Sequence, residues 1–270
     1  VHQRSQWQAK AMAEPRVLII VPTLGTRIDF LQQCLESISS QDTPADLVVV
    51  CPRDSFEARK LAFDHHAHVI DDPGSLPKAI NAGATQLKPH HEFINWLGDD
   101  DLLESGSLSS TTKTLDRNPQ ATVAFGACRY IDNNNKELWI SRAGKWAPRI
   151  LSWGPDLIPQ PGMLVRSEAW TAVGGVDESL SMAFDLDLLL KLKQQGPLID
   201  CNAVVASFRW HTTSLTASDR TRNLDESEQV KRRYLTNTQS GMKWLWEKPV
   251  RVATRIAARE VQRRAKAADK

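Results

Sequence analysis

The sequence lacks any apolar run long enough to cross a membrane. Its longest purely aliphatic run is Val17–Val21, far short of the ~20 residues that a membrane-spanning helix needs. Residues 1–16 are polar and carry both charge signs, so we expect no signal peptide there. We therefore expect a cytoplasmic protein and leave open its peripheral attachment at the cytoplasmic face of the membrane.

Cysteine is also scarce, and its spacing suits neither a zinc site nor a disulfide framework. The 4 cysteines contain no Cys-x-x-Cys pair, and several lie in apolar, strand-like runs: Cys34, Cys51, Cys128 and Cys201. This placement predicts reduced, buried thiols. The histidine clusters at 65–68 and 90–91 lie in polar stretches. We expect them to be surface residues rather than zinc ligands.

The chain has no large excess of either charge. Its 270 residues are 41% hydrophobic and 24% charged, with a formal net charge of +2. This composition excludes a disordered chain and argues against a nucleic-acid-binding protein. The length suits one large domain with an extension, and we find no internal repeat or low-complexity block.

Short apolar runs alternate with helical patterns, which predicts an α/β fold with a largely parallel sheet. The predicted strands are 17–21, 47–51, 69–70, 93–97, 121–132, 163–165 and 204–210. The predicted helices are 28–40, 77–87, 105–116 and 184–195. Residues 133–161 have weak periodicity and are expected to form a loop-rich or hairpin insertion. The predicted domain covers 17–236, between a polar tail at 1–16 and a basic tail at 237–270.

The basic tail is expected to be helical, because its arginines recur every fourth residue: Arg251, Arg255, Arg259 and Arg263. A solvated helix, or one packed on its own domain, accounts for this stripe. Attachment to an anionic membrane surface through residues 242–266 is one alternative, and a calmodulin-like or nucleic-acid partner is another.

Three adjacent carboxylates follow the predicted strand at 93–97. Asp99, Asp100 and Asp101 have no Lys or Arg near them in sequence, because none lies between Lys88 and Lys113. Like charges ~4 Å apart near a protein surface repel by roughly 4 kcal/mol. A divalent cation with oxygen ligands, Mn²⁺ or Mg²⁺, would compensate this charge. A solvated acidic turn near a helix N-terminus is the simpler alternative.

Several segments, in order along the chain, together resemble the inverting, GT-A-fold glycosyltransferases of family 2. They cover roughly residues 17–215 and are Pro22–Arg27, Gly74–Gly83, Leu97–Leu103, Gly174–Glu178 and Ala183–Leu188. The resemblance implies a GT-A-like, Rossmann-type α/β/α sandwich with a mixed, mostly parallel sheet. It also implies hexosyl or deoxyhexosyl transfer from a nucleoside-diphosphate sugar to a hydroxyl of a glycan or lipid-linked acceptor, in surface or cell-envelope polysaccharide synthesis.

The resemblance assigns roles to particular residues of this sequence. The metal ligands would be Asp99, Asp100, Asp101 and His211. The nucleotide sugar would contact Pro22, Thr23, Arg27, Lys78, Asn81, Asp99 and Asp100. The acceptor side would include Gln160 and Phe184. The second strand lacks the Asp that commonly reads the base in this family, and Asp54 is a candidate substitute.

Asp185 is the predicted general base. Asp187 has Lys191 four residues later and is expected to form a surface ion pair. Asp185 has no local cation and lies in the first turn of a predicted helix, where the helix dipole favours its ionised form. An ionised carboxylate facing a cleft can remove the proton of an acceptor hydroxyl.

Two other functional classes fit parts of this pattern. A nucleotidyltransferase making sugar nucleotides would share the fold and the metal. It would need a glycine-rich, basic phosphate loop after the first strand, and residues 22–27 contain only Gly25 and Arg27. A catalytically silent carbohydrate-binding protein could also keep the fold, but it would not need both the acidic turn and Asp185.

Overall fold

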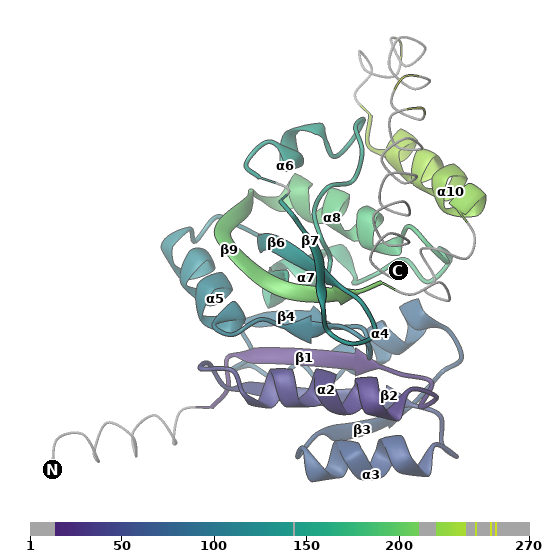
Figure 1. The fold of residues 1–270 in the computed structure, drawn as a ribbon. Helices are drawn as coiled ribbons and strands as arrows, with labels where there is room; N and C mark the ends of the chain where they lie inside the picture. The colour runs from purple at the N-terminus through teal and green to yellow at the C-terminus, as the bar shows by residue number, and fades with distance from the viewer. Residues whose placement is uncertain are drawn as a thin grey trace, which may run out of the picture.

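The fold is taken from a computed structural model that describes residues 14–142, 144–210 and 220–235, together with 241, 249 and 252 (Figure 1). The strands are β1 (Val17–Pro22), β2 (Ala45–Cys51), β3 (His68–Asp71), β4 (Phe93–Trp96), β5 (Leu102–Leu103), β6 (Val123–Ile131), β7 (Glu137–Ser141), β8 (Leu164–Arg166) and β9 (Leu198–Arg209). The helices are α2 (Ile28–Ser39), α3 (Phe56–Asp64), α4 (Leu76–Ala84), α5 (Ser107–Arg117), α6 (Ala147–Ile150), α7 (Ser167–Val173), α8 (Phe184–Gln195) and α10 (Arg220–Arg233).

The strands form one mixed, 9-stranded sheet in the order β3-β2-β1-β4-β8-β6-β9-β5, with β7 paired to β6. Strands β3, β2, β1 and β4 run parallel. β8 is antiparallel to both β4 and β6, whereas β9 is parallel to β6. The carboxyl ends of β1 and β4 therefore lie side by side at one edge of the sheet, where α/β folds bind their ligands.

Helices cover both faces of this sheet, as the sandwich prediction requires. Buried residues of α2, α3 and α5 pack with one set of alternating β1 and β2 side chains, including Ile19 and Val49. Buried residues of α4, α7 and α8 pack with the other set, including Ile20 and Val50. The period of two along each strand assigns its side chains alternately to these layers.

Most predicted elements are confirmed within a few residues, and the helix predicted at 184–195 coincides with α8. The helix predicted at 77–87 is shorter, since α4 ends at Ala84. The strand predicted at 204–210 is longer, because β9 begins at Leu198. The predicted insertion holds the hairpin strand β7 and the short helix α6. The basic tail lies outside the described residues apart from isolated positions.

Helix α10 packs against α8, at the end of the molecule away from α3 (Figure 1). Within the described part of the chain, no helix is long and apolar enough to span a bilayer. All four cysteines are free; Cys34, Cys51 and Cys128 are buried, and Cys201 is partly buried.

Candidate active site

The acidic turn after β4 is bound by an arginine side chain from a segment distant in sequence. The Arg27 guanidinium, just before α2, donates to Asp99 Oδ1 at 2.5 Å and to Asp100 Oδ2 at 2.6 Å. The Thr23 hydroxyl, just after β1, donates to Asp99 Oδ2 at 2.5 Å. The adjacent ends of β1 and β4 therefore bring Thr23, Arg27, Asp99 and Asp100 together.

Asp101 points away from this pair and into the protein. Its Oδ1 accepts the backbone N–H of Arg209 at 3.0 Å. The fully buried Arg209 side chain donates to the carbonyl oxygens of Asp100 and Asp132. Its guanidinium also lies over the Phe30 ring, 4.3 Å from the centroid. Arg209 therefore fixes the backbone of the turn, while Asp99 and Asp100 present the carboxylates that meet Arg27.

Burial works against the negative charge of this turn. It raises the pKa of Asp99, an effect that the Thr23 hydrogen bond and the Arg27 charge partly oppose. Burial also raises the pKa of Asp101, and the neighbouring Asp100 carboxylate adds to that shift. The sequence predicted that a positive charge from elsewhere would compensate the three carboxylates. Arg27 and Arg209, both distant in sequence, supply such charge. The carboxylate oxygens of Asp99 and Asp100, already converging on one cation, fit a Mn²⁺ or Mg²⁺ ion of higher charge.

Asp185 lies in the first turn of α8, and a second acidic residue shapes the loop before it. The Asp185 Oδ1 accepts the Leu186 N–H at 2.7 Å. Glu226 of α10 accepts the backbone N–H groups of Met182 and Ala183 at 2.5 and 2.7 Å. Burial raises the pKa of Asp185 to about 6, and the Glu226 charge contributes to that rise. Asp185 is therefore poised to exchange a proton near neutral pH.

Asp156, from the insertion before β8, interacts with the same carboxylate. Asp156 is an exposed residue, yet the protein around its carboxyl group removes enough water to raise its pKa to about 7. The Asp185 charge adds to this rise, and Lys231 of α10 opposes it. Lys231 also donates to the Gly154 carbonyl at 2.5 Å. The two carboxyl groups thus titrate as a pair in the range where general bases work.

Trp96 joins the acidic turn to the Asp185 region. It ends β4, three residues before Asp99, and its ring centroid lies 6.2 Å from that of Phe184. The Gln160 amide donates to the Trp96 carbonyl at 2.8 Å. Gln160 and Phe184, the predicted acceptor-side residues, therefore both contact the residue that links the two halves of the site.

Other predicted donor-side residues are placed less directly. Pro22 is buried at the end of β1, and Lys78 is exposed on α4. The Asn81 amide donates to the Val176 carbonyl at 2.9 Å and accepts its N–H at 3.1 Å. Asn81 therefore ties α4 to the segment before α8. His211 lies outside the described residues, so its role stays a prediction.

After β2, where the resembled family commonly has a base-reading Asp that this chain lacks, the structure has an ion-pair group. Arg53 and Arg59 both bind the Asp71 carboxylate at the end of β3, at 2.6 and 2.9 Å. Both arginines lower the pKa of Asp71. Asp54, the proposed substitute, is exposed next to this group.

Asp187 forms the predicted ion pair, but the expected surface location is wrong. Its side chain is fully buried, 2.8 Å from Lys191 Nζ. The Tyr234 hydroxyl donates to its other carboxylate oxygen at 2.7 Å. Tyr234 directly follows α10, so the packing of α10 against α8 brings its hydroxyl to Asp187. The burial of Asp187 therefore depends on a distant helix, which the local pattern of α8 could not reveal. Asp187 therefore anchors α8 rather than facing solvent.

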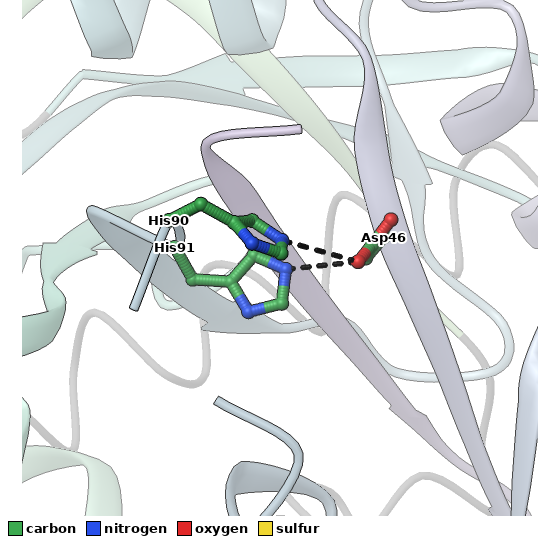
Figure 2. Close-up of side chains that lie close together, drawn as sticks. All are labelled: Asp46, His90 and His91. Atoms are coloured by element: carbon green, nitrogen blue, oxygen red, sulfur yellow. Dashed lines mark hydrogen bonds and ion pairs between the residues drawn. The ribbon is translucent and has the colours of Figure 1, made fainter. Parts of the chain in front are cut away.

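The expectation that the 90–91 histidines lie on the surface is also wrong, because His91 is buried beside Asp46 (Figure 2). In the described residues, Asp46, His90 and His91 place their ligand atoms close enough to hold a metal ion. His91 Nδ1 accepts the Lys88 N–H at 3.0 Å, which puts the ring proton on Nε2, 3.0 Å from Asp46. Burial lowers the pKa of His91, so a neutral, hydrogen-bonded histidine accounts for this group. It lies at the opposite ends of the strands from Asp99.

Sequence reasoning missed Asp156, Glu226 and Arg209. Asp156 follows Gly154-Pro155 in a stretch without periodicity, and Glu226 lies on a helix that was not predicted. A usable signal existed for Arg209 only, since it is a charged residue inside an apolar predicted strand. Such a residue is rarely buried without partners.

Comparison with known proteins identifies relatives of this chain. The family model described as "Glycosyltransferase like family 2" matches residues 15–234. The O-antigen biosynthesis protein RfbC of Myxococcus xanthus is 24% identical over 201 residues, which cover 69% of this chain. The match spans only 15% of that relative's length.

Solved structures share the fold at low sequence identity. S. aureus TarS 1–349 in complex with UDP-GlcNAc has a TM-score of 0.62 and 16% identity, covering 80% of this chain and 65% of its own. The mannosyltransferase PcManGT of Pyrobaculum calidifontis, in complex with GDP-Man and Mn²⁺, has a TM-score of 0.61 and 17% identity. That match covers 92% of this chain and 76% of the mannosyltransferase.

Proposed function

Because the chain belongs to the glycosyltransferase like family 2, we propose that it is a metal-dependent, inverting glycosyltransferase using a nucleoside-diphosphate sugar. The acceptor would be a hydroxyl of a glycan or a lipid-linked glycan. One observation carries this proposal. Asp99 and Asp100 converge on the Arg27 guanidinium after β4, and Trp96 at the end of that strand packs against Phe184, the residue before Asp185.

On the donor side, the residues present suit a diphosphate. A Mn²⁺ or Mg²⁺ ion bound by Asp99 and Asp100 would neutralise the negative charge that develops on the departing diphosphate. Arg27, released from those carboxylates, offers a planar guanidinium whose geometry matches phosphate oxygens. Thr23 holds Asp99 in position from the end of β1.

On the acceptor side, Asp185 takes the proton of the attacking hydroxyl. The hydroxyl oxygen forms a bond to the anomeric carbon of the sugar as the bond to the diphosphate oxygen breaks. This single displacement inverts the anomeric configuration. Desolvation raises the pKa of Asp185 to about 6. At neutral pH the carboxylate is then largely ionised and is a stronger base than an ordinary aspartate.

The relatives support the class of substrate. TarS was solved with UDP-GlcNAc and PcManGT with GDP-Man and Mn²⁺. The similarity to an O-antigen biosynthesis protein favours surface polysaccharide synthesis, with hexosyl or deoxyhexosyl transfer. Work at the cytoplasmic face of the membrane is part of the same proposal. Family membership favours transfer over nucleotidyl transfer or a silent binding role.

A thermal-shift screen tests the proposal directly. Nucleoside diphosphates and their sugar conjugates, each with Mn²⁺ and with EDTA, would be added to the full chain. We expect at least one nucleotide to raise the melting temperature in Mn²⁺, and EDTA to remove that rise. Slow, metal-dependent hydrolysis of the matching donor should accompany it. If no nucleotide shifts the melting temperature, a donor site at Asp99 and Asp100 is wrong.

A further inference from the structure

Aromatic side chains form a continuous row across β7, β6 and β9. Tyr130 on β6 pairs with Trp139 on β7 and with Phe208 on β9. The Tyr130 and Trp139 rings stack, with centroids 4.3 Å apart and an interplanar angle of 16°, and Phe208 lies 5.2 Å from Tyr130. Trp210 lies 6.4 Å from each of the other three rings. We call these four residues the aromatic row.

The aromatic row is not part of either hydrophobic core of the described chain. All four side chains are only partly buried, and none belongs to the clusters that join the sheet to its helices. Apolar surface that a fold leaves in partial contact with water, gathered in one place, commonly marks a binding site.

The row faces the same side of the sheet as the acceptor-side carboxylates. Arg209 lies between Phe208 and Trp210 along β9, and its side chain contacts Phe30 and Gln33 of α2. Because side chains alternate along a strand, Phe208 and Trp210 face away from α2. They face the side covered by α8, which carries Asp185.

Tyr130 lies near charged groups from both parts of the proposed site. Burial raises the pKa of its hydroxyl, and the nearby Cys128, Asp101 and Asp156 groups add to the shift. The Tyr130 hydroxyl is therefore within electrostatic reach of both the acidic turn and the carboxyl group that interacts with Asp185.

We propose that the aromatic row binds a sugar ring of the acceptor, an inference that rests on the proposed transfer function. A sugar ring has a C–H face that packs on an aromatic ring and a rim of hydroxyls that need hydrogen-bond partners. The row supplies aromatic faces, and Asp156, which lies near Tyr130, supplies a hydrogen-bond acceptor. An alkyl chain would fill the apolar surface but leave that carboxyl group unmatched.

Saturation-transfer difference NMR on the full chain tests this assignment. The probes are methyl and octyl glycosides of glucose, galactose and rhamnose. The variants are Trp139→Leu and Phe208→Leu, and the control is Phe63→Leu, whose parent ring is 77% exposed on α3. We expect at least one methyl glycoside to bind, with affinity at least fivefold weaker in both row variants and unchanged in the control. Circular dichroism melts establish that each variant is folded.

Other outcomes overturn the inference. Equal affinity of the row variants would place the sugar elsewhere, as would a lack of binding by every glycoside. Binding of octyl but not methyl glycosides, whatever the sugar, would assign the row to a lipid chain instead. Calorimetry of nucleoside diphosphates with Mn²⁺ distinguishes failure of this inference from failure of the proposed function. Nucleotide binding without glycoside binding removes only this inference, whereas loss of both removes the proposed function.

Discussion

Asp185 combines a position in the first turn of α8 with a pKa raised to about 6 by burial. The helix dipole favours the carboxylate, and desolvation favours the acid. The result is a carboxyl group that ionises close to neutral pH, as the proposed role of general base requires. The structure gives Asp185 no direct ion pair among the described residues, in contrast to Asp187, which Lys191 binds at 2.8 Å.

Replacing Asp185 with Asn should leave donor binding intact and lower turnover by about 10²–10⁴-fold, the range for loss of a general base. The amide keeps the shape of the side chain but cannot accept the hydroxyl proton. Steady-state kinetics and calorimetry of the nucleoside diphosphate separate the two effects. Retention of full turnover would remove Asp185 as the base.

The pH dependence of the same step tests the order in which the two carboxyl groups ionise. The base is active only when ionised, so kcat should fall as the pH drops through the pKa of Asp185, about 6. Asp156, whose pKa is raised to about 7, is still largely protonated at that pH and places little charge beside Asp185. The Asp156→Asn change should therefore leave the acid limb of the kcat profile near pH 6. A limb displaced to lower pH would mean that Asp156 ionises before Asp185.

At the scale of elements, α10 and the residue after it hold α8 and its neighbouring loops in place. Glu226 accepts backbone N–H groups ahead of α8, Tyr234 donates to the buried Asp187, and Lys231 binds the Gly154 carbonyl. These contacts reach both the loop carrying Asp156 and the segment leading to Asp185. Helix α10 therefore positions the segments that carry these two carboxyl groups.

The Glu226→Gln change should destabilise the protein by about 1–3 kcal/mol, because part of the hydrogen bonding to the 181–183 backbone loses its charged acceptor. We expect a lower free energy of unfolding in urea and a reduced kcat, with nucleotide affinity unchanged. As a comparison, Glu57→Gln at an exposed position of α3 should change stability by less than about 0.5 kcal/mol, the usual range for surface substitutions. Equal effects of the two changes would argue against a special role for Glu226.

Elements with a clear period could be predicted from the sequence, and others could not. Helix α8 has apolar residues at helical spacing and a Gly196-Pro197 stop. Helix α3 was missed because its pattern is inverted: Phe56 and Phe63 are 79% and 77% exposed. The small side chains of Ala58 and Ala62 are buried instead. Periodicity of large apolar residues cannot reveal such a helix.

The same limit applies to the site. The acidic turn and Asp185 follow recognisable local patterns. The partners that set their charge come from distant segments, as with Arg27, which is 72 residues from Asp99. The sequence around the acidic turn contains no positive residue to balance its charge. Only the fold reveals that distant arginines provide that positive charge. Asp156 lies in a loop whose position depends on packing against α10.

At the scale of the whole molecule, one mixed sheet underlies both proposed halves of the site. The carboxylates of the proposed donor side follow β4, beside the end of β1, whereas Asp185 lies on α8 and Asp156 in the loop before β8. The family model covers residues 15–234, which contains both halves. The boundaries predicted for the domain at 17–236 and the basic tail at 237–270 stay a prediction.

Calorimetry of a nucleoside diphosphate with Mn²⁺ tests the central claim most directly, using Asp100→Asn and Asp185→Asn as a matched pair. Both changes remove one carboxylate without changing side-chain size. The account predicts that Asp100→Asn loses at least tenfold in Mn²⁺-dependent affinity, about 1.4 kcal/mol, while Asp185→Asn binds as the parent does. Parent-like affinity in Asp100→Asn would contradict it.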